Sequence, residues 1–119
     1  MTYWIFLDET RTPPAQPPYP HLAREAVTVR SYEEFQAVLD ARGGPAFVSF
    51  GDGLGPEMSC LDCAQVLIEA AMDGAIQLPS DFSFEVHAEE PELAGNTKGL
   101  LTSFFKHMHP FHAFYRWAS

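Results

Sequence analysis

Residues 3–9 of the chain read Tyr-Trp-Ile-Phe-Leu-Asp-Glu. An apolar run that stops at two adjacent carboxylates is typical of a buried strand with acids at its carboxyl end. In open α/β sheets, ligands bind in the crevice beyond the carboxyl ends of the strands. The stretch therefore predicts an α/β fold with a candidate site at this edge of its sheet.

The rest of the chain alternates short strand patterns with helical ones. Ser31 with Glu34 and Ser59 with Asp62 form capping boxes, which predict where two helices begin. A third helix is expected after Asn96. The predicted strands cover residues 3–7, 26–30, 46–50 and 82–87, and the predicted helices run to about Arg42, Met72 and Met108. This alternation indicates a mostly parallel sheet of four to five strands with helices on both faces.

Length and composition narrow the class of protein. The chain has 119 residues, 46% of them hydrophobic, which fits one globular domain over residues 1–119. A proline-rich loop is expected at residues 12–20 and an aromatic tail at residues 109–119. No secretory leader and no apolar run of about 20 residues is found, so the expectation is a soluble, cytoplasmic protein without a membrane partner.

The net charge of −9 argues against binding to duplex nucleic acid. It favours cations or basic protein surfaces as partners, although the simpler explanation is that the charge keeps a small domain soluble.

The two cysteines, Cys60 and Cys63, can be interpreted in two ways. Together with His107, His109 and His112 they contain the side chains that bind zinc. They also fall on a regular helical apolar stripe, and free cysteine is among the most buried residue types. We expect both thiols to lie in the core.

Polar residues follow three of the predicted strands. Asp8, Glu9 and Arg11 follow the first strand, Asp52 follows the third, and His87 ends the fourth. Carboxylates at such an edge suit Mg²⁺ or Mn²⁺, and a histidine there is suited to acid–base chemistry near neutral pH. Each residue also has a structural explanation: solvated acids at a strand end, an arginine paired with them, and a hydrogen-bonded histidine.

Five strings in the same order resemble the cyclic-phosphate-processing receiver-like domains. They are Phe-Leu-Asp-Glu-x-Arg-Thr-Pro-Pro, Val-Arg-Ser-Tyr-Glu-Glu-Phe, Val-Ser-Phe-Gly-Asp-Gly-Leu-Gly, Leu-Asp-Cys-Ala-Gln-Val-Leu and Val-His-Ala-Glu-Glu-Pro with Gly95-Asn96. The match runs from residue 4 to about residue 104. The resemblance implies a receiver-like (Rossmannoid, flavodoxin-like) fold that recognises or processes cyclic-phosphate or nucleotide-type ligands.

Carried over by position, the resemblance gives the residues at the motif positions an expected role, with Glu9 standing where the family has a second aspartate. Metal binding is implied for Asp8 and Glu9, ligand binding for Arg11, Asp62 and Asn96, and catalysis for His87 and Asp52. Asp62 also has a complete structural explanation as a helix cap.

The chain departs from the family at the third strand, where the motif usually reads Phe-Asp-His-Asp-Leu-Gly. Gly51 and Gly53 replace both aspartates, and Asp52 replaces the histidine. Phosphotransfer of the response-regulator kind is therefore not expected, because glycine cannot accept a phosphoryl group.

The leading hypothesis is a pocket that binds a small phosphate-containing ligand, with a divalent metal as an optional partner and phosphoesterase activity if it is active. The alternative is a non-enzymatic acidic protein-interaction module, such as an inhibitor, adaptor or immunity-type protein.

Overall fold

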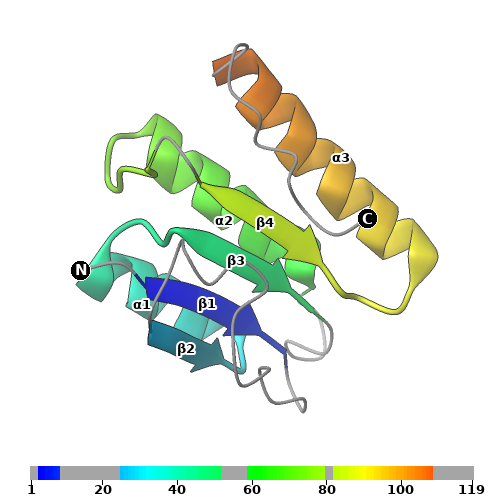
Figure 1. Cartoon of the computed structure of the whole chain (residues 1–119), viewed down its shortest axis with the longest axis horizontal. Helices are drawn as coiled ribbons and strands as arrows, with labels where there is room; N and C mark the ends of the chain where they lie inside the picture. The colour runs from blue at the N-terminus through cyan, green and yellow to red at the C-terminus, as the bar shows by residue number, and fades with distance from the viewer. Residues whose placement is uncertain (1–2, 9–24, 52–58, 80–81, 109–119) are drawn as a thin grey trace.

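A computed structural model of the chain describes residues 3–8, 25–51, 59–79 and 82–108. Its sheet is entirely parallel, in the order β2-β1-β3-β4 (Figure 1). The strands are β1 (Tyr3–Leu7), β2 (Glu25–Val29), β3 (Phe47–Phe50) and β4 (Ser83–Val86), and the helices are α1 (Tyr32–Arg42), α2 (Cys60–Met72) and α3 (Pro91–Met108). This order is that of flavodoxin-like folds, so the predicted fold class is confirmed. The proline-rich loop and the aromatic tail lie outside the described residues.

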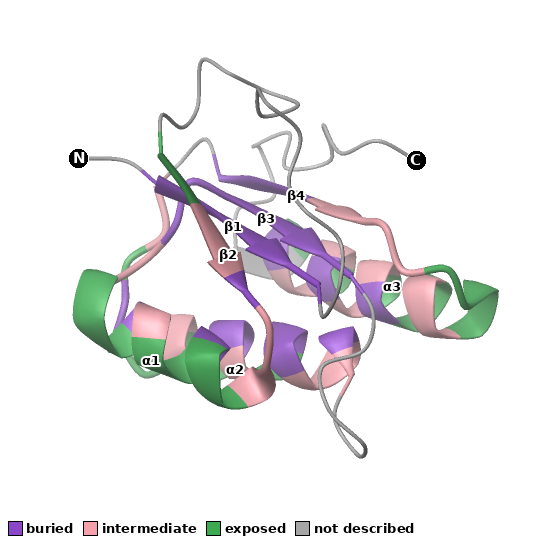
Figure 2. Ribbon diagram, turned by 90° about the horizontal axis from the view of Figure 1, so that it is seen from below, coloured by how far each residue is buried: buried purple, intermediate pink, exposed green. Residues whose placement is uncertain are grey.

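All three described helices pack on one face of the sheet (Figure 2). The main core lies between that face and the helices. It contains Ile5, Leu7, Val48, Phe50 and Phe84 from the strands, with Phe35 and Leu39 of α1, Leu67 of α2 and Leu101 and Phe105 of α3. The predicted helical layer on the second face is not found among the described residues. The chain between β1 and β2, where such a helix would lie in a doubly wound fold, belongs to residues 9–24, which fall outside them.

A smaller aromatic cluster lies on the second face of the sheet. Side chains alternate along a strand, so Trp4 and Phe6 point away from the helices and form this cluster with Ala46 and Phe47. The rings of Trp4 and Phe6 meet edge to face, with centroids 6.2 Å apart. The same alternation directs Ser49, Glu85, Asp8 and His87 to this face, beyond the aromatic cluster toward the carboxyl ends of the strands.

The helix starts follow their local capping residues. The Asp62 carboxylate accepts the Ser59 N–H at 2.8 Å, and α2 has the predicted capping box. The Ser31 hydroxyl accepts the Glu34 N–H at 3.1 Å, which is half of the other predicted box, whereas the Glu34 carboxylate accepts the N–H of Arg30 at 2.8 Å.

The predicted start of the last helix, after Asn96, was wrong, because α3 begins at Pro91. The Glu90 side chain accepts the N–H groups of Glu92 and Leu93 at 3.1 and 2.7 Å. Proline fits the first helical position, where no backbone donor is needed. These two residues explain the early start.

Both cysteines lie in the core, as predicted. Cys60 and Cys63 have no exposed surface, and burial raises the pKa of the Cys63 thiol well above its usual range. Zinc binds thiolates, so this environment disfavours a zinc site. Within the described ranges no three His, Cys, Asp or Glu residues are grouped to hold a metal ion. The side chain of His107 and the residues His109 and His112 lie outside the described part.

None of the helices in the described part of the chain is long and apolar enough to cross a membrane.

Candidate functional site

Four polar side chains form a continuous hydrogen-bonded chain across three strands, which we call the polar chain: Asp8, His87, Ser49 and Glu85. The sheet register explains how they meet. Phe6 pairs with Ser49, and Ser49 pairs with Glu85, so these three side chains share one row on the second face. Asp8, Gly51 and His87 lie two residues further along the same strands and therefore on the same face.

Backbone hydrogen bonds fix Asp8 and His87, the two ends of the row that also contains Gly51. The Asp8 N–H donates to the Val29 carbonyl at 3.0 Å, and the His87 N–H donates to the Phe50 carbonyl at 2.7 Å. Both residues therefore continue the ladders of β1 and β4 by one position. Their side chains are placed by the sheet itself rather than by a loop.

The imidazole of His87 is held on both of its ring nitrogens. Nε2 lies 3.0 Å from Asp8 Oδ2, and Nδ1 lies 2.7 Å from Ser49 Oγ. Ser49 Oγ in turn donates to Glu85 Oε2 at 2.8 Å. The ring also stacks on Phe6, with centroids 4.8 Å apart and planes 12° from parallel. Three strands and an aromatic ring together set the orientation of His87.

The polar chain consists of three hydrogen bonds, and each hydrogen bond needs one proton. One arrangement places both ring protons on His87, with the Ser49 hydroxyl donating to an ionised Glu85. A second arrangement results when one proton crosses from His87 Nδ1 to Ser49 Oγ and another crosses from Ser49 Oγ to Glu85 Oε2, so that a protonated Glu85 donates to Ser49 and Ser49 donates to a neutral His87. In both, the Nε2–H of His87 points to an ionised Asp8. The geometry thus couples the charge of His87 to that of Glu85.

Gly51 makes the contact between Asp8 and His87 possible. It lies between them in the row, on the strand that the imidazole must cross. A β-carbon at position 51 would overlap His87 Nε2 and would lie 2.6 Å from Asp8 Oδ2 and 2.5 Å from the Leu7 carbonyl oxygen. The space that a side chain at position 51 would need is filled by the His87–Asp8 pair.

The side chain of His87 is more exposed to solvent than those of its two hydrogen-bond partners, Asp8 and Ser49. Its side chain is 20% exposed, whereas Asp8 is 2% exposed and Ser49 is fully buried. A serine, a histidine and an aspartate in series resemble a hydrolase triad, but a nucleophile must reach the substrate. The burial of Ser49 excludes that role in this conformation.

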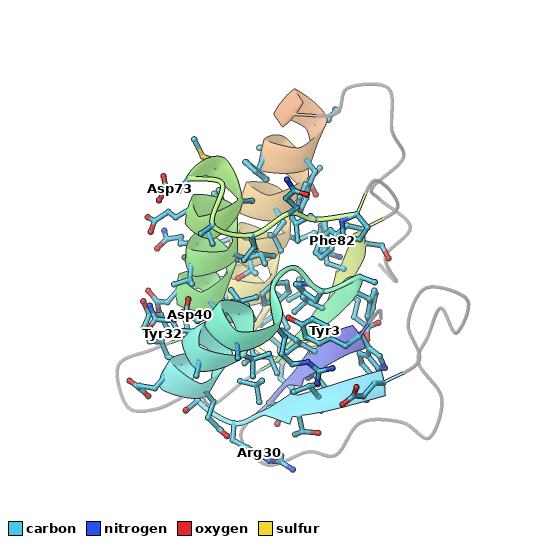
Figure 3. The ribbon with its side chains drawn as sticks, turned by 90° about the vertical axis from the view of Figure 1, so that its left-hand side faces the viewer. Tyr3, Arg30, Tyr32, Asp40, Asp73 and Phe82 are labelled. Atoms are coloured by element: carbon cyan, nitrogen blue, oxygen red, sulfur yellow. The ribbon has the colours of Figure 1, made fainter. Side chains whose placement is uncertain are left out.

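Arg30 adds a positive charge at the same edge of the sheet. It follows β2 (Figure 3), and its Nη1 donates to the carbonyl oxygen of Asp8 at 3.2 Å. The order of the strands reverses between β1 and β3, which makes this edge the topological switch point where ligands bind in open α/β sheets. Arg30 and His87 thus lie near the place where the fold class puts its ligands.

The structure brings together two of the predicted site residues, Asp8 and His87. Asp62 caps α2 through Ser59, as its structural interpretation predicted. Asn96 is exposed in the second turn of α3 rather than in a loop. The candidates Glu9, Arg11 and Asp52 lie outside the described residues.

The sequence prediction missed Ser49 and Glu85, and it interpreted Gly51 only as the loss of a family aspartate. The sequence did show two pairs at a spacing of two residues on a strand, Glu85 with His87 and Ser49 with Gly51. Residues at that spacing share a face.

Comparisons with protein-family models, with curated proteins and with solved structures found no match for this chain.

Proposed function

We propose that this chain is a receiver-like binding domain that takes a small phosphate-containing anion at the carboxyl edge of its sheet, with His87 as the group that meets the ligand. The observation that carries the proposal is the polar chain, which holds a partly exposed imidazole at the switch point of the sheet. Asp8 and Ser49 have almost no exposed surface, so His87 is the member of that trio that a ligand can reach.

The chemistry of the edge supports an anionic ligand. Arg30 brings a positive charge to the edge, and in the arrangement with protons on both ring nitrogens His87 adds a second one and is a hydrogen-bond donor. Phosphate oxygens accept hydrogen bonds from both kinds of group. On binding, the Nε2–H of His87 is shared between Asp8 and a ligand oxygen. Cyclic phosphates, nucleotides and simple phosphate esters all present such oxygens.

Binding is a better description of this site than turnover. Gly51 offers no carboxylate, and the adjoining space is already occupied. Ser49 is buried and Asp8 is engaged by His87. A general acid or base gives up or takes a proton at the substrate, whereas the Nε2–H of His87 stays bonded to Asp8 and Nδ1 faces Ser49, so a ligand oxygen only shares the Nε2 proton.

A divalent metal is an optional partner in this proposal. Asp8 is buried and one of its oxygens is bonded to His87, so Mg²⁺ or Mn²⁺ would reach this carboxylate only after that hydrogen bond opened. Mg²⁺ is commonly held by one or two carboxylates together with phosphate oxygens of the ligand. A metal would therefore bind with the phosphate ligand rather than in a resident site built by the described residues.

The test is a thermal-shift and calorimetry screen against inorganic phosphate, cyclic and linear nucleotides and phosphate esters, each with and without Mg²⁺ or Mn²⁺. A ligand at about 100 times its Kd should stabilise the fold by roughly 2.7 kcal/mol. We expect the shift to disappear in His87→Ala and to persist in Asp40→Asn, which removes an exposed carboxylate elsewhere. A shift that survives His87→Ala, or a panel without any hit, would refute the proposal.

A further inference from the structure

A groove of about 270 Å³ opens between α1 and α2, away from the polar chain. Its floor is apolar and contains Leu39, which is 3% exposed, with Val66 and Ala70 beside it. Tyr32 and Asp40 line the groove from α1, and they lie on the same side of the molecule as Asp73 at the end of α2 (Figure 3). Glu69 and Asp73 line it from α2.

Two acidic residues along this groove occupy positions that are unfavourable for the stability of α2. Glu69 and Asp73 are four residues apart, a spacing at which like charges repel. Asp73 is also the C-cap of α2, and the last turn of that helix carries no basic residue. The carboxyl end of a helix carries a partial negative charge that disfavours acids. Helix formation alone therefore gives no reason for acids at these positions, and a bound cation would relieve both conflicts.

The shape and composition of the groove fit one long cationic side chain. None of the described residues that line it is a lysine or an arginine. Long cationic side chains lay their methylene groups on apolar surface and keep the charge at a polar rim, which matches a floor around Leu39 below Asp40, Glu69 and Asp73. The Tyr32 ring favours arginine over lysine, because a planar guanidinium stacks on aromatic faces and pairs with carboxylates through two hydrogen bonds.

We propose that the groove between α1 and α2 docks an arginine side chain presented by a basic protein partner. The formal net charge of −9 would steer such a partner toward this chain. The proposal does not depend on ligand binding at the polar chain, because the groove shares no residue with it.

The first test uses a capped hexa-arginine peptide, followed by ¹H–¹⁵N NMR and calorimetry at about 0.15 M salt. We expect saturable shifts centred on the backbone amides of Leu39, Ala70 and Asp73. Hexalysine should bind more weakly, and a hexacitrulline peptide, which keeps the side-chain shape without the charge, should not bind. Equal binding of the lysine and arginine peptides, or shifts spread over the whole surface, would overturn the assignment.

Two triple variants separate local docking from the overall charge. One carries Asp40→Asn, Glu69→Gln and Asp73→Asn in the groove, and its control carries Glu33→Gln, Glu89→Gln and Glu92→Gln elsewhere. Each raises the formal net charge from −9 to −6. Three exposed ion pairs together change Kd by about tenfold, so the groove variant should bind hexa-arginine about tenfold more weakly and the control should change little. Equal loss in both variants would refute docking in the groove.

The groove variant should fold, because the three substituted side chains are exposed. Circular dichroism should show a melting temperature at or above that of the unmodified chain, since two unfavourable placements of charge have been removed. A melting temperature clearly below it would show that the acids serve the fold instead, and it would overturn the proposal.

Discussion

Replacing Gly51 with alanine tests the geometry on which the candidate site depends. The new methyl group would overlap the imidazole of His87 and would lie 2.5 Å from the backbone carbonyl oxygen of Leu7. The imidazole can swing away, but the carbonyl belongs to β1 and can move only with the sheet. We therefore expect both the loss of the Asp8–His87 hydrogen bond and a local displacement of strands.

The magnitude follows from these two effects. A hydrogen bond to a charged group contributes about 1.5–3 kcal/mol, and Asp8, at 2% exposure, would be left without its imidazole. Forcing an extra methyl group into packed structure costs about 1–3 kcal/mol. The sum predicts that Gly51→Ala lowers the free energy of unfolding by about 3 kcal/mol or more, a large part of the roughly 5–15 kcal/mol typical of a domain.

Urea denaturation measures the effect, and Gly99→Ala is the matched control. Gly99 lies within α3, and a β-carbon there would meet nothing within 4 Å. Alanine is the better helix former by about 0.8–1 kcal/mol, so the control should be more stable than the unmodified chain. With a typical urea m-value, Gly51→Ala should move the unfolding midpoint down by about 1–2 M or more.

The same substitution in a His87→Ala background makes the test specific. With the imidazole gone, Gly51→Ala should cost at least about 1 kcal/mol less than it does alone, because the two sites share a contact. If Gly51→Ala were as harmless as Gly99→Ala, or if its cost were unchanged without His87, the explanation of Gly51 given above would be wrong.

Three further predictions concern the core. Burial raises the pKa of Tyr3 to about 12 in the folded chain, so the folded state keeps the tyrosine proton to a higher pH than the unfolded state does. The free energy of unfolding should therefore fall between about pH 10 and pH 12. Denaturation measured over this pH range should show that Tyr3→Phe removes this part of the fall. Cys60 and Cys63 should not react with a thiol reagent at pH 8 until urea unfolds the chain, and fast labelling of the native protein would contradict their burial. The hydroxyl of Ser83 is buried and has no hydrogen-bond partner in the described structure, so Ser83→Ala should stabilise the fold by about 1 kcal/mol in calorimetry, and a destabilised variant would show that the hydroxyl is satisfied.

Much of the fold could be predicted from the sequence, because the local signals and the tertiary structure agree. The apolar run at residues 3–7 became the buried strand β1, and the capping boxes at Ser31 and Ser59 mark two real helix starts. The start of α3 was missed because Gly95 and Asn96 suggest a loop. The capping of the first turn by Glu90 and the position of Pro91 outweigh that local preference.

The candidate site could be predicted only in part. Asp8 and His87 were recognised because each stands at the end of a strand pattern. Their direct contact could not be foreseen, because it depends on the order β2-β1-β3-β4, which places both on the same edge with β3 between them. Ser49 and Glu85 were missed because they lie within apolar strands, where a polar residue shows its role only once the register is known.

The pairing of Ser49 with Glu85 also bears on how the sheet chooses among alternative alignments. Polar residues alternate with Phe82, just before β4, and with Phe84 and Val86 within it, so sliding the strand by two positions would keep every apolar side chain on the helix-facing side. Burial of apolar surface by itself discriminates poorly between these alignments. After such a slide, Ser49 would face Ser83 or His87 in place of Glu85, and the links to Asp8 would break. Four polar side chains thus discriminate against misaligned strands that hydrophobic burial would accept.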